Sequence, residues 1–215
     1  MMGKRLGTLL IAVGLIFISV AIYQYVDYQV STRKALEEAE NMLRRKLPQA
    51  QQPADTMTST GHEPDLPVYT EREDFEPKDD DVVGILNIPK LDAELPIIEG
   101  TEEEMLAKGV GHYTKSVFPS DGEQILLSGH RDTVFRNFGL LEIGDRFIVE
   151  LPYGKFEYEI KETKIVDEDD RTVIRPMGEE VLTVSTCYPF RFIGNAPQRY
   201  IVYAYPVTLN NSLNL

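Results

Sequence analysis

The chain of 215 residues contains one cysteine, Cys187, and its thiol is the side chain best suited to covalent chemistry. A single cysteine can form neither an intramolecular disulfide nor a multi-thiolate zinc site. A lone thiol is therefore either a small apolar residue in a core or a reactive group. The stretch leading to Cys187 indicates which of the two applies.

In that stretch large apolar residues alternate with small polar ones. Leu182 and Val184 form the apolar set, and Thr183 and Ser185 form the small polar set, which continues to Cys187. Alternation of this kind is typical of a β-strand with one face toward a core and one face outward. Because Cys187 falls in the small polar set, we expect it at the end of a strand on the outward face. This position favours a nucleophile over a packing role, and a nucleophilic thiol requires a base or a cation nearby.

The chain has three histidines that could supply the base, namely His62, His112 and His130. His62 lies in a polar, proline-containing segment and is expected to be solvated. His130 directly follows a strand pattern that ends in Ser-Gly, whereas His112 lies in a loop-like stretch between glycine and tyrosine. Catalytic groups are often displayed at strand ends, which favours His130 and leaves His112 as the alternative. Either histidine could instead be a hydrogen-bonded surface residue.

Arg199 is the best candidate for a cation beside the thiol. Eleven residues containing proline and glycine separate it from Cys187, and the strand pattern 200–205 follows it. If that strand pairs antiparallel with the strand ending at Cys187, the two residues lie opposite each other, with Cα atoms ~5 Å apart. A guanidinium there could stabilise an oxyanion. Arg191 in the connection is the competing candidate, and a surface arginine at a strand start is the plainer interpretation.

Several short elements must position these residues. Residues 82–207 contain many strand patterns broken by glycine and proline, and the turn signal at 152–154 predicts a hairpin. Helical patterns are limited to residues 102–108 and 133–141. Many short strands with little helix predict a mainly β fold, a barrel or a sandwich.

The N-terminal residues 6–26 carry no charge and would form a helix of roughly 31 Å, enough to cross a bilayer core of ~30 Å. Lys4 and Arg5 precede this run, so the remainder of the chain is expected outside the cell. We interpret residues 1–27 as a cytoplasmic tip and a transmembrane anchor. The alternative is a signal peptide cleaved after Ala21, but the apolar run continues past that residue and favours the anchor.

Four further segments follow the anchor. Residues 28–48 have a helical pattern and are predicted to form a stalk, and residues 49–81 have the composition of a flexible linker. Residues 82–207 form the predicted catalytic domain, and residues 208–215 form a polar tail.

The charge balance and the acidic runs limit the possible partners. The net charge of −13 makes nucleic acid an unfavourable partner, because phosphates would be repelled. The acidic runs at residues 102–104 and 167–170 are most simply solvated surface charges. We therefore expect no required cofactor and no metal site.

Four motifs together resemble those of the sortases. Residues 183–187, Thr-Val-Ser-Thr-Cys, resemble the sortase T-L-x-T-C signature, with valine where leucine is usual. Residues 129–132, 111–113 and 199–202 resemble companion sortase motifs in the expected order. The resemblance covers about residues 82–206. The order and spacing of the motifs, together with the N-terminal anchor, make a specific signal.

The resemblance is greatest to class D sortases. The sequence Thr-Cys-Tyr-Pro-Phe over residues 186–190 and the lack of a second apolar span favour that class. The Asp-Pro-aromatic lid triplet of pilus-building sortases does not precede the domain, which disfavours a pilus polymerase. The family implies an eight-stranded β-barrel preceded here by a transmembrane helix, with its catalytic domain on the outer face of a Gram-positive cell membrane.

The resemblance also implies a reaction. Cys187 would attack the threonine carbonyl of an LPxTG-like signal near the C-terminus of a secreted protein, and a cell-wall amine, from lipid II or peptidoglycan, would resolve the thioester. His130 would be the general acid and base, Arg199 would stabilise the oxyanion, and Thr186 would lie near the bound substrate. His112 would be structural or adjacent to the substrate.

Two other functions remain open from the sequence. The first is a secreted cysteine hydrolase that uses the same Cys187, His130 and Arg199 but passes the acyl group to water. The second is a membrane-tethered, non-catalytic β-barrel binding module in which Cys187 is incidental. Dependence of the product on an amine separates the first from a transpeptidase, and the effect of Cys187→Ala separates the second.

Overall fold

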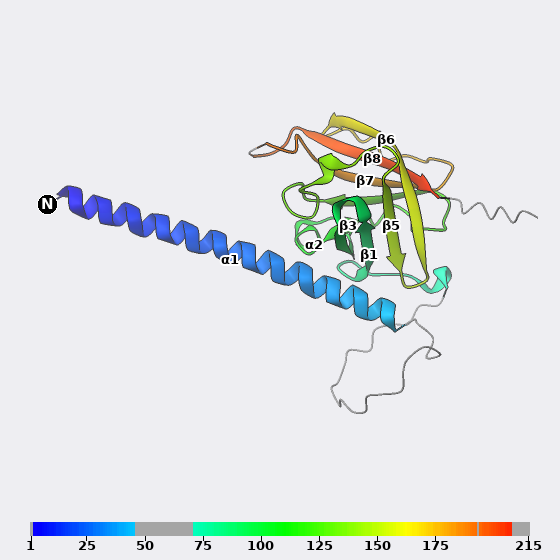
Figure 1. The fold of residues 1–215 in the computed structure, drawn as a ribbon, viewed down its shortest axis with the longest axis horizontal. Coiled ribbons are helices and arrows are strands. Elements are labelled where there is room, and N and C mark those ends of the chain that lie inside the picture. The colour runs from blue at the N-terminus through cyan, green and yellow to red at the C-terminus, as the bar shows by residue number, and fades with distance from the viewer. Residues whose placement is uncertain (1, 46–70, 193, 208–215) are drawn as a thin grey trace, which may run out of the picture.

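A closed β-barrel forms the body of this computed structural model, which describes residues 2–45, 71–192 and 194–207 (Figure 1). Within these residues eight strands close the barrel in the order β1-β2-β3-β4-β7-β8-β6-β5. The strands are β1 (Val82–Ile88), β2 (Ala93–Glu99), β3 (Val110–His112), β4 (Gln124–Gly129), β5 (Arg146–Leu151), β6 (Gly154–Asp167), β7 (Val181–Tyr188) and β8 (Gln198–Pro206). The predicted mainly β, eight-stranded barrel is confirmed.

Helical structure is scarce in the barrel, as the sequence predicts. The helices are α1 (Met2–Arg44) and α2 (Glu103–Leu106), with 3-10 turns η2 (Arg72–Asp74), η3 (Pro89–Leu91) and η4 (Phe138–Leu140). The helix expected at 102–108 is present as the shorter α2. The helix expected at 133–141 is wrong, because that segment forms turns and the single turn η4. Phe135 and Phe138 are both fully buried there, so core packing outweighs a weak helical pattern.

The strand pairing follows two predictions made from the sequence. β5 and β6 form an antiparallel hairpin across the turn at 152–154, with Leu151 opposite Gly154. β7 and β8 are antiparallel, with Cys187 opposite Arg199. The β2–β3 and β4–β7 pairs are parallel, which the sequence did not indicate.

The barrel interior is filled by apolar side chains from every strand. Among them, Phe147, Ile160, Leu182, Val184 and Val202 have at most 2% of their surface exposed. Phe75 joins this core although it belongs to the segment 49–81 that composition predicts as a linker. Its ring packs edge-on against Phe118 at a centroid distance of 5.0 Å. Burial of a large aromatic side chain is stabilising, which accounts for its place in the core. The remaining linker residues up to 70 and the tail 208–215 lie outside the described residues, as does His62.

One continuous helix, α1, runs from Met2 to Arg44 and includes both the predicted anchor and most of the predicted stalk 28–48 (Figure 1). Between Leu10 and Val26 its large apolar side chains are exposed. Its C-terminal half contacts β1 and β2, and there Ala35 and Ala39 are almost completely buried. The small alanines allow the helix to lie close to the outer face of these strands.

Candidate active site

Three neighbouring strand ends bring the sequence-predicted residues together. In the parallel β4–β7 pair, Gly129 lies opposite Thr186, so the next residues lie side by side: His130 just after β4 and Cys187 near the end of β7. On the other side of β7, Cys187 lies opposite Arg199 of β8. Adjacent strands are ~4.8 Å apart, so the three residues form a row across one end of the barrel.

The thiol of Cys187 is partly exposed, and it is not part of a disulfide. The predicted alternation along β7 holds for Leu182 and Val184, which are fully buried in the barrel core. Ser185, on the same face as Cys187, is partly exposed. Thr183 differs from the expectation of an open outer face, because it is buried and accepts a 2.9 Å hydrogen bond from Gln124 Nε2.

His130 is the histidine at the open edge. Its side chain is 33% exposed, and Nε2 lies 3.4 Å from Oε1 of Glu103, a carboxylate that is itself 80% exposed. A contact this accessible is screened by solvent and is readily displaced by a substrate. The imidazole therefore remains accessible to a substrate at the edge where Cys187 lies.

His112 has the opposite environment. Its side chain is 1% exposed, and Nδ1 lies 2.7 Å from Oε2 of the buried Glu99. Nε2 lies 3.1 Å from the carbonyl oxygen of Val117, and the ring stacks on Phe118 with a centroid distance of 4.0 Å. Both ring nitrogens are thus committed inside the protein. Of the two histidines that the residues alone left open, only His130 can face a substrate at the edge with Cys187.

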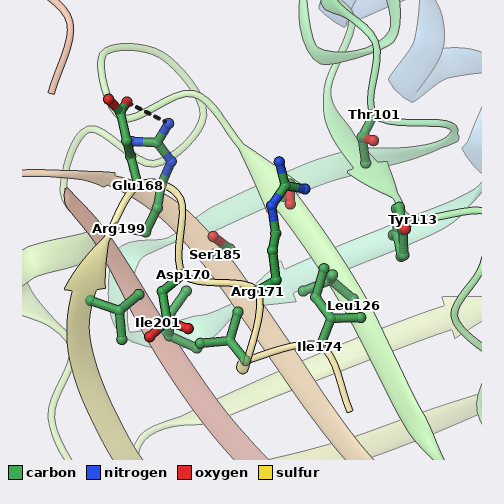
Figure 2. A pocket seen from close by; sticks show the side chains of 13 residues that line it. Thr101, Tyr113, Leu126, Glu168, Asp170, Arg171, Ile174, Ser185, Arg199 and Ile201 are labelled. Atoms are coloured by element: carbon green, nitrogen blue, oxygen red, sulfur yellow. Dashed lines mark hydrogen bonds and ion pairs between the residues drawn. The ribbon is translucent and has the colours of Figure 1, made fainter. Parts of the chain in front are cut away.

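Arg199 is held at the entrance of a groove. Its Nη1 donates to the carbonyl oxygens of Ala196 and Gln198 at 3.1 and 3.0 Å. Its Nη2 lies 3.4 Å from Oε2 of Glu168, the contact drawn in Figure 2. Arg191, the competing candidate, is exposed in the β7–β8 connection and has no register partner beside the thiol.

Thr186 does not face the groove. Its side chain is 3% exposed, and its hydroxyl donates a 2.8 Å hydrogen bond to the carbonyl oxygen of Gly129. This bond joins β7 to β4 one residue before both Cys187 and His130. The contact is therefore suited to fixing the spacing of the thiol and the imidazole.

Arg131 is a residue of this site that the sequence reasoning did not select. Its side chain is only 6% exposed, and Nη1 donates a 2.8 Å hydrogen bond to the carbonyl oxygen of Pro189. Nε and Nη2 donate to the carboxylate of Asp132 at 3.2 and 2.9 Å, which lowers the pKa of that carboxyl below its usual value. Arg131, which directly follows His130, is thus hydrogen-bonded to the backbone two residues after Cys187. It lies within the Gly-His-Arg-Asp motif, but no sequence pattern distinguishes a buried arginine from an exposed one.

An aromatic cluster supports the backbone on both sides of the thiol. Tyr200 lies 5.1 Å from Phe190 and 6.2 Å from Tyr188, measured between ring centroids. Phe138 of η4 meets the same Tyr200 ring edge-on at 6.3 Å. Ring contacts of this kind stabilise the end of β7, which carries Cys187, and the β7–β8 connection that follows it.

A groove of about 240 Å³ begins beside this row and runs over the outer face of β4, β7 and β8. It passes Ser128 and Ser185, which lie two residues before His130 and Cys187 on the same faces. Figure 2 shows the side chains that line it. They are Thr101, Tyr113, Leu126, Ser128, Val166, Glu168, Asp170, Arg171, Val173, Ile174, Ser185, Arg199 and Ile201.

The β6–β7 connection forms one wall of this groove. Asp170 is engaged within that wall, where its carboxylate accepts hydrogen bonds from the backbone and hydroxyl of Thr172 at 2.8 and 2.7 Å. These bonds lower the pKa of Asp170 below its usual value. The mixture of apolar and hydrogen-bonding groups suits an extended peptide.

The arrangement is suited to acyl transfer. A thiol can form a thioester, an imidazole beside it can move the proton, and a guanidinium can stabilise the oxyanion. Among the described residues no cluster of three or more His, Cys, Asp or Glu side chains is placed to hold a metal ion.

Comparisons with known proteins agree with this description. The profile of the sortase domain matches residues 86–207. Sortase D of Bacillus subtilis (strain 168) is 45% identical over 208 residues, which are 96% of this chain and 100% of that protein. The catalytic domain of B. anthracis SrtD has a TM-score of 0.53 and 40% identity, covering 67% of this chain and 97% of that one. A Clostridium perfringens Sortase D5 transpeptidase has a TM-score of 0.56 and 28% identity, covering 61% and 82%.

Proposed function

This chain belongs to the sortase family of cysteine transpeptidases, and we propose that it cleaves LPxTG-like sorting signals of secreted proteins and joins them to a cell-wall amine. The observation that supports this most directly is the row of His130, Cys187 and Arg199 across three neighbouring strand ends. The proposal combines the family's reaction with a groove that leads to this row.

Acylation begins when the Cys187 thiolate attacks the carbonyl carbon of the signal's threonine. The carbonyl oxygen becomes an oxyanion, and Arg199 stabilises it after exchanging its weak contact with Glu168 for the substrate. His130 gives its proton to the leaving nitrogen as the carbon–nitrogen bond breaks. The products are a thioester on Cys187 and a released C-terminal segment with a free amine.

Transfer reverses these roles. The amine of a cell-wall precursor, lipid II or peptidoglycan, attacks the thioester carbonyl, and His130 accepts a proton from the attacking nitrogen. The carbon–sulfur bond breaks, Cys187 leaves as a thiolate, and a new amide bond joins the protein to the wall. Water in place of the amine gives hydrolysis by the same steps.

The groove accounts for recognition of the residues before the threonine. A peptide whose threonine carbonyl lies at Cys187 runs along the outer face past Ser185 toward Leu126 and Ile201. The apolar side chains accept the leucine and proline of the signal, and the β6–β7 connection covers it from one side. Thr186 acts by holding β7 against β4.

The anchor half of α1 supports a membrane location. Leu10–Arg44 includes a window with mean hydropathy of 1.9 that is long and apolar enough to span a bilayer, and it is not buried in the protein. Lys4 and Arg5 precede this helix half, so the barrel lies on the outer side of the membrane. The enzyme then meets both secreted substrates and lipid-carried amines.

A direct test uses the full chain in liposomes with a panel of LPxTG-type peptides, with and without glycine or diaminopimelate amines. Mass spectrometry should detect an amide-linked product that is lost in Cys187→Ala. If the peptide were only hydrolysed, the activity would be that of a cysteine hydrolase and not of a transpeptidase. No reaction with any peptide, together with unchanged behaviour of Cys187→Ala, would favour the non-catalytic binding module.

A further inference from the structure

We propose that the active-site end of the barrel rests on the surface of the phospholipid bilayer that α1 crosses, through an apolar rim formed by Leu140, Ile143 and Phe192. The proposal rests on the membrane anchoring proposed above, and it adds an interaction surface on the barrel itself. Three observations carry it: the contact of α1 with the barrel, the direction in which the barrel end faces, and the exposure of the rim.

One helix, α1, carries the apolar run in its N-terminal half and contacts the barrel with its C-terminal half. Ala35 and Ala39 of α1 are 5% and 0% exposed where the helix contacts β1 and β2. Ile85 and Pro96, which pair across those two strands, are buried although they lie outside the barrel core. Val26 ends the apolar run nine residues before Ala35, a helical rise of about 14 Å. The barrel is therefore held close to the membrane in one orientation.

The barrel end that carries the site faces the membrane half of α1. In Figure 1, β6 ends and β8 begins on the side of the barrel toward which the N-terminal half of α1 extends. The strand pairing places the ends of β4 and β7 and the start of β5 at this same end. Cys187 and the segment 138–146 accordingly lie on the membrane side.

Three of the five large exposed apolar residues of the described barrel lie on segments at this end. Leu140, Ile143 and Phe192 are 62%, 60% and 42% exposed. The segments that carry them touch, because a Cβ added to Gly139 would lie 2.7 Å from the ring of Phe190. Exposed apolar groups grouped on one surface mark a contact site, and aromatic side chains favour the membrane interface. The opposite end of the described barrel has no comparable group of large exposed apolar residues.

Basic residues accompany the rim. Arg191 precedes Phe192 and is exposed, and Arg136, which donates to the carbonyl oxygen of Asp132, lies exposed just before η4. The acidic Glu142 between Leu140 and Ile143 is paired with Lys90 at 3.2 Å. A guanidinium beside apolar side chains suits the boundary between phosphate headgroups and acyl chains. The rim would thus place the thiol of Cys187 near the surface where lipid-linked amines are anchored.

The experiment uses the full chain in liposomes and takes advantage of its single cysteine. A fluorophore on Cys187 donates energy to acceptors on lipid headgroups, and separate unlabelled samples are assayed with a soluble amine and with a lipid-linked amine. Phe192→Asp and Leu140→Asp are compared with Lys155→Asp, an exposed position beside the turn at 152–154. We expect both rim variants to lose energy transfer and to slow transfer to the lipid-linked amine severalfold. The soluble-amine reaction and the Lys155→Asp control should remain unchanged.

Two results would overturn the proposal, and they are distinguishable. Energy transfer that is the same in the rim variants and the native chain, while all of them float with the liposomes, would reject the rim contact alone. A native chain that does not float with liposomes would reject both the anchoring and the rim. The soluble-amine reaction tests the catalytic proposal separately, because it needs no membrane.

Discussion

The two Gly-His segments of the barrel contain the same residue type in opposite environments. His130 stands at a strand end with a third of its side chain exposed, and its ring lies within 3.4 Å of Glu103, an exposed glutamate. His112 is buried, and both of its nitrogens and one ring face are occupied by the protein. A histidine that must move protons needs an accessible nitrogen, whereas one that holds strands together needs fixed partners. Burial and commitment of the nitrogens, rather than the motif, separate the two roles.

The largest effect should come from the exposed histidine. We expect His130→Gln to lower kcat/KM for peptide cleavage by about 10²–10⁴-fold, the usual contribution of a general acid and base. The midpoint of thermal unfolding should stay close to that of the native chain, because Glu103, which the His130 ring contacts, is itself exposed. Steady-state kinetics together with calorimetry would check this. If His130→Gln retained full activity, another group would have to act as the general acid and base.

The buried histidine should show the reverse pattern. His112→Gln leaves the Glu99 carboxylate buried at 5% exposure without its partner. Removing the hydrogen-bond partner of a buried polar group costs about 1–3 kcal/mol of the free energy of unfolding. Chemical denaturation should reveal the loss, and activity per folded molecule should change far less than in His130→Gln. A large fall in kcat without loss of stability would contradict the structural role.

Arg131 extends the comparison between the two histidines, because it is buried like His112 yet lies next to His130 at the edge with Cys187. In Arg131→Gln the Pro189 carbonyl and the Asp132 carboxylate lose their donor, at a cost of about 1–3 kcal/mol. Unlike His112→Gln, this variant should also lower kcat for peptide cleavage, because Arg131 connects the segment after His130 to the Pro189 carbonyl beyond Cys187. Arg131→Lys serves as the matched control and should restore part of the lost kcat. If kcat per folded molecule were unchanged in Arg131→Gln, the role of Arg131 would be purely structural.

Glu168 tests whether Arg199 is restrained before substrate binds. Glu168→Gln removes the charge that holds Nη2, so the guanidinium is freer to meet the oxyanion. We expect a twofold to threefold rise in kcat/KM, since an exposed pair contributes about 0.2–1 kcal/mol. Initial rates with a signal peptide would measure it, and Arg199→Ala in the same background should abolish the gain. A fall in rate would indicate that Glu168 positions Arg199 productively.

The smallest expected effect concerns acid stability at Asp132. Its pKa is lowered in the folded state mainly by the hydrogen bond from Arg131, so the pair stabilises the fold above the ordinary aspartate range. That stabilisation should disappear as pH falls through the lowered pKa. Because the carboxylate is 73% exposed, the contribution should stay below about 1 kcal/mol. Unfolding measured between neutral and acidic pH should show a shallower decline in Asp132→Asn.

Local patterns were sufficient to predict much of the catalytic edge. The alternation through Leu182 and Val184 identified the inward face of β7, and the short connection to Arg199 predicted the antiparallel pair that the structure confirms. The hairpin at 152–154 was likewise predictable from its turn residues. Each of these features depends on residues close together in the chain.

Features that depend on distant segments were not predictable in the same way. Thr186 was expected near the substrate, but it lies against Gly129 because β4 runs parallel to β7, a pairing between segments 57 residues apart. Composition placed Phe75 in a predicted linker, but in the structure its side chain packs into the barrel core. The docking of α1 through Ala35 and Ala39 also depends on the outer face of β1 and β2.

The sequence by itself determined the single thiol at a strand end, the apolar helix at the N-terminus and the mainly β character of residues 82–207, because each depends on composition or on short-range periodicity. Only the tertiary structure decided which histidine is buried and that Arg131 reaches the backbone beyond Cys187. Periodicity tells which side chains share a face, but burial and hydrogen-bond partners are set by whichever strand packs alongside. In this barrel that strand often comes from far along the chain.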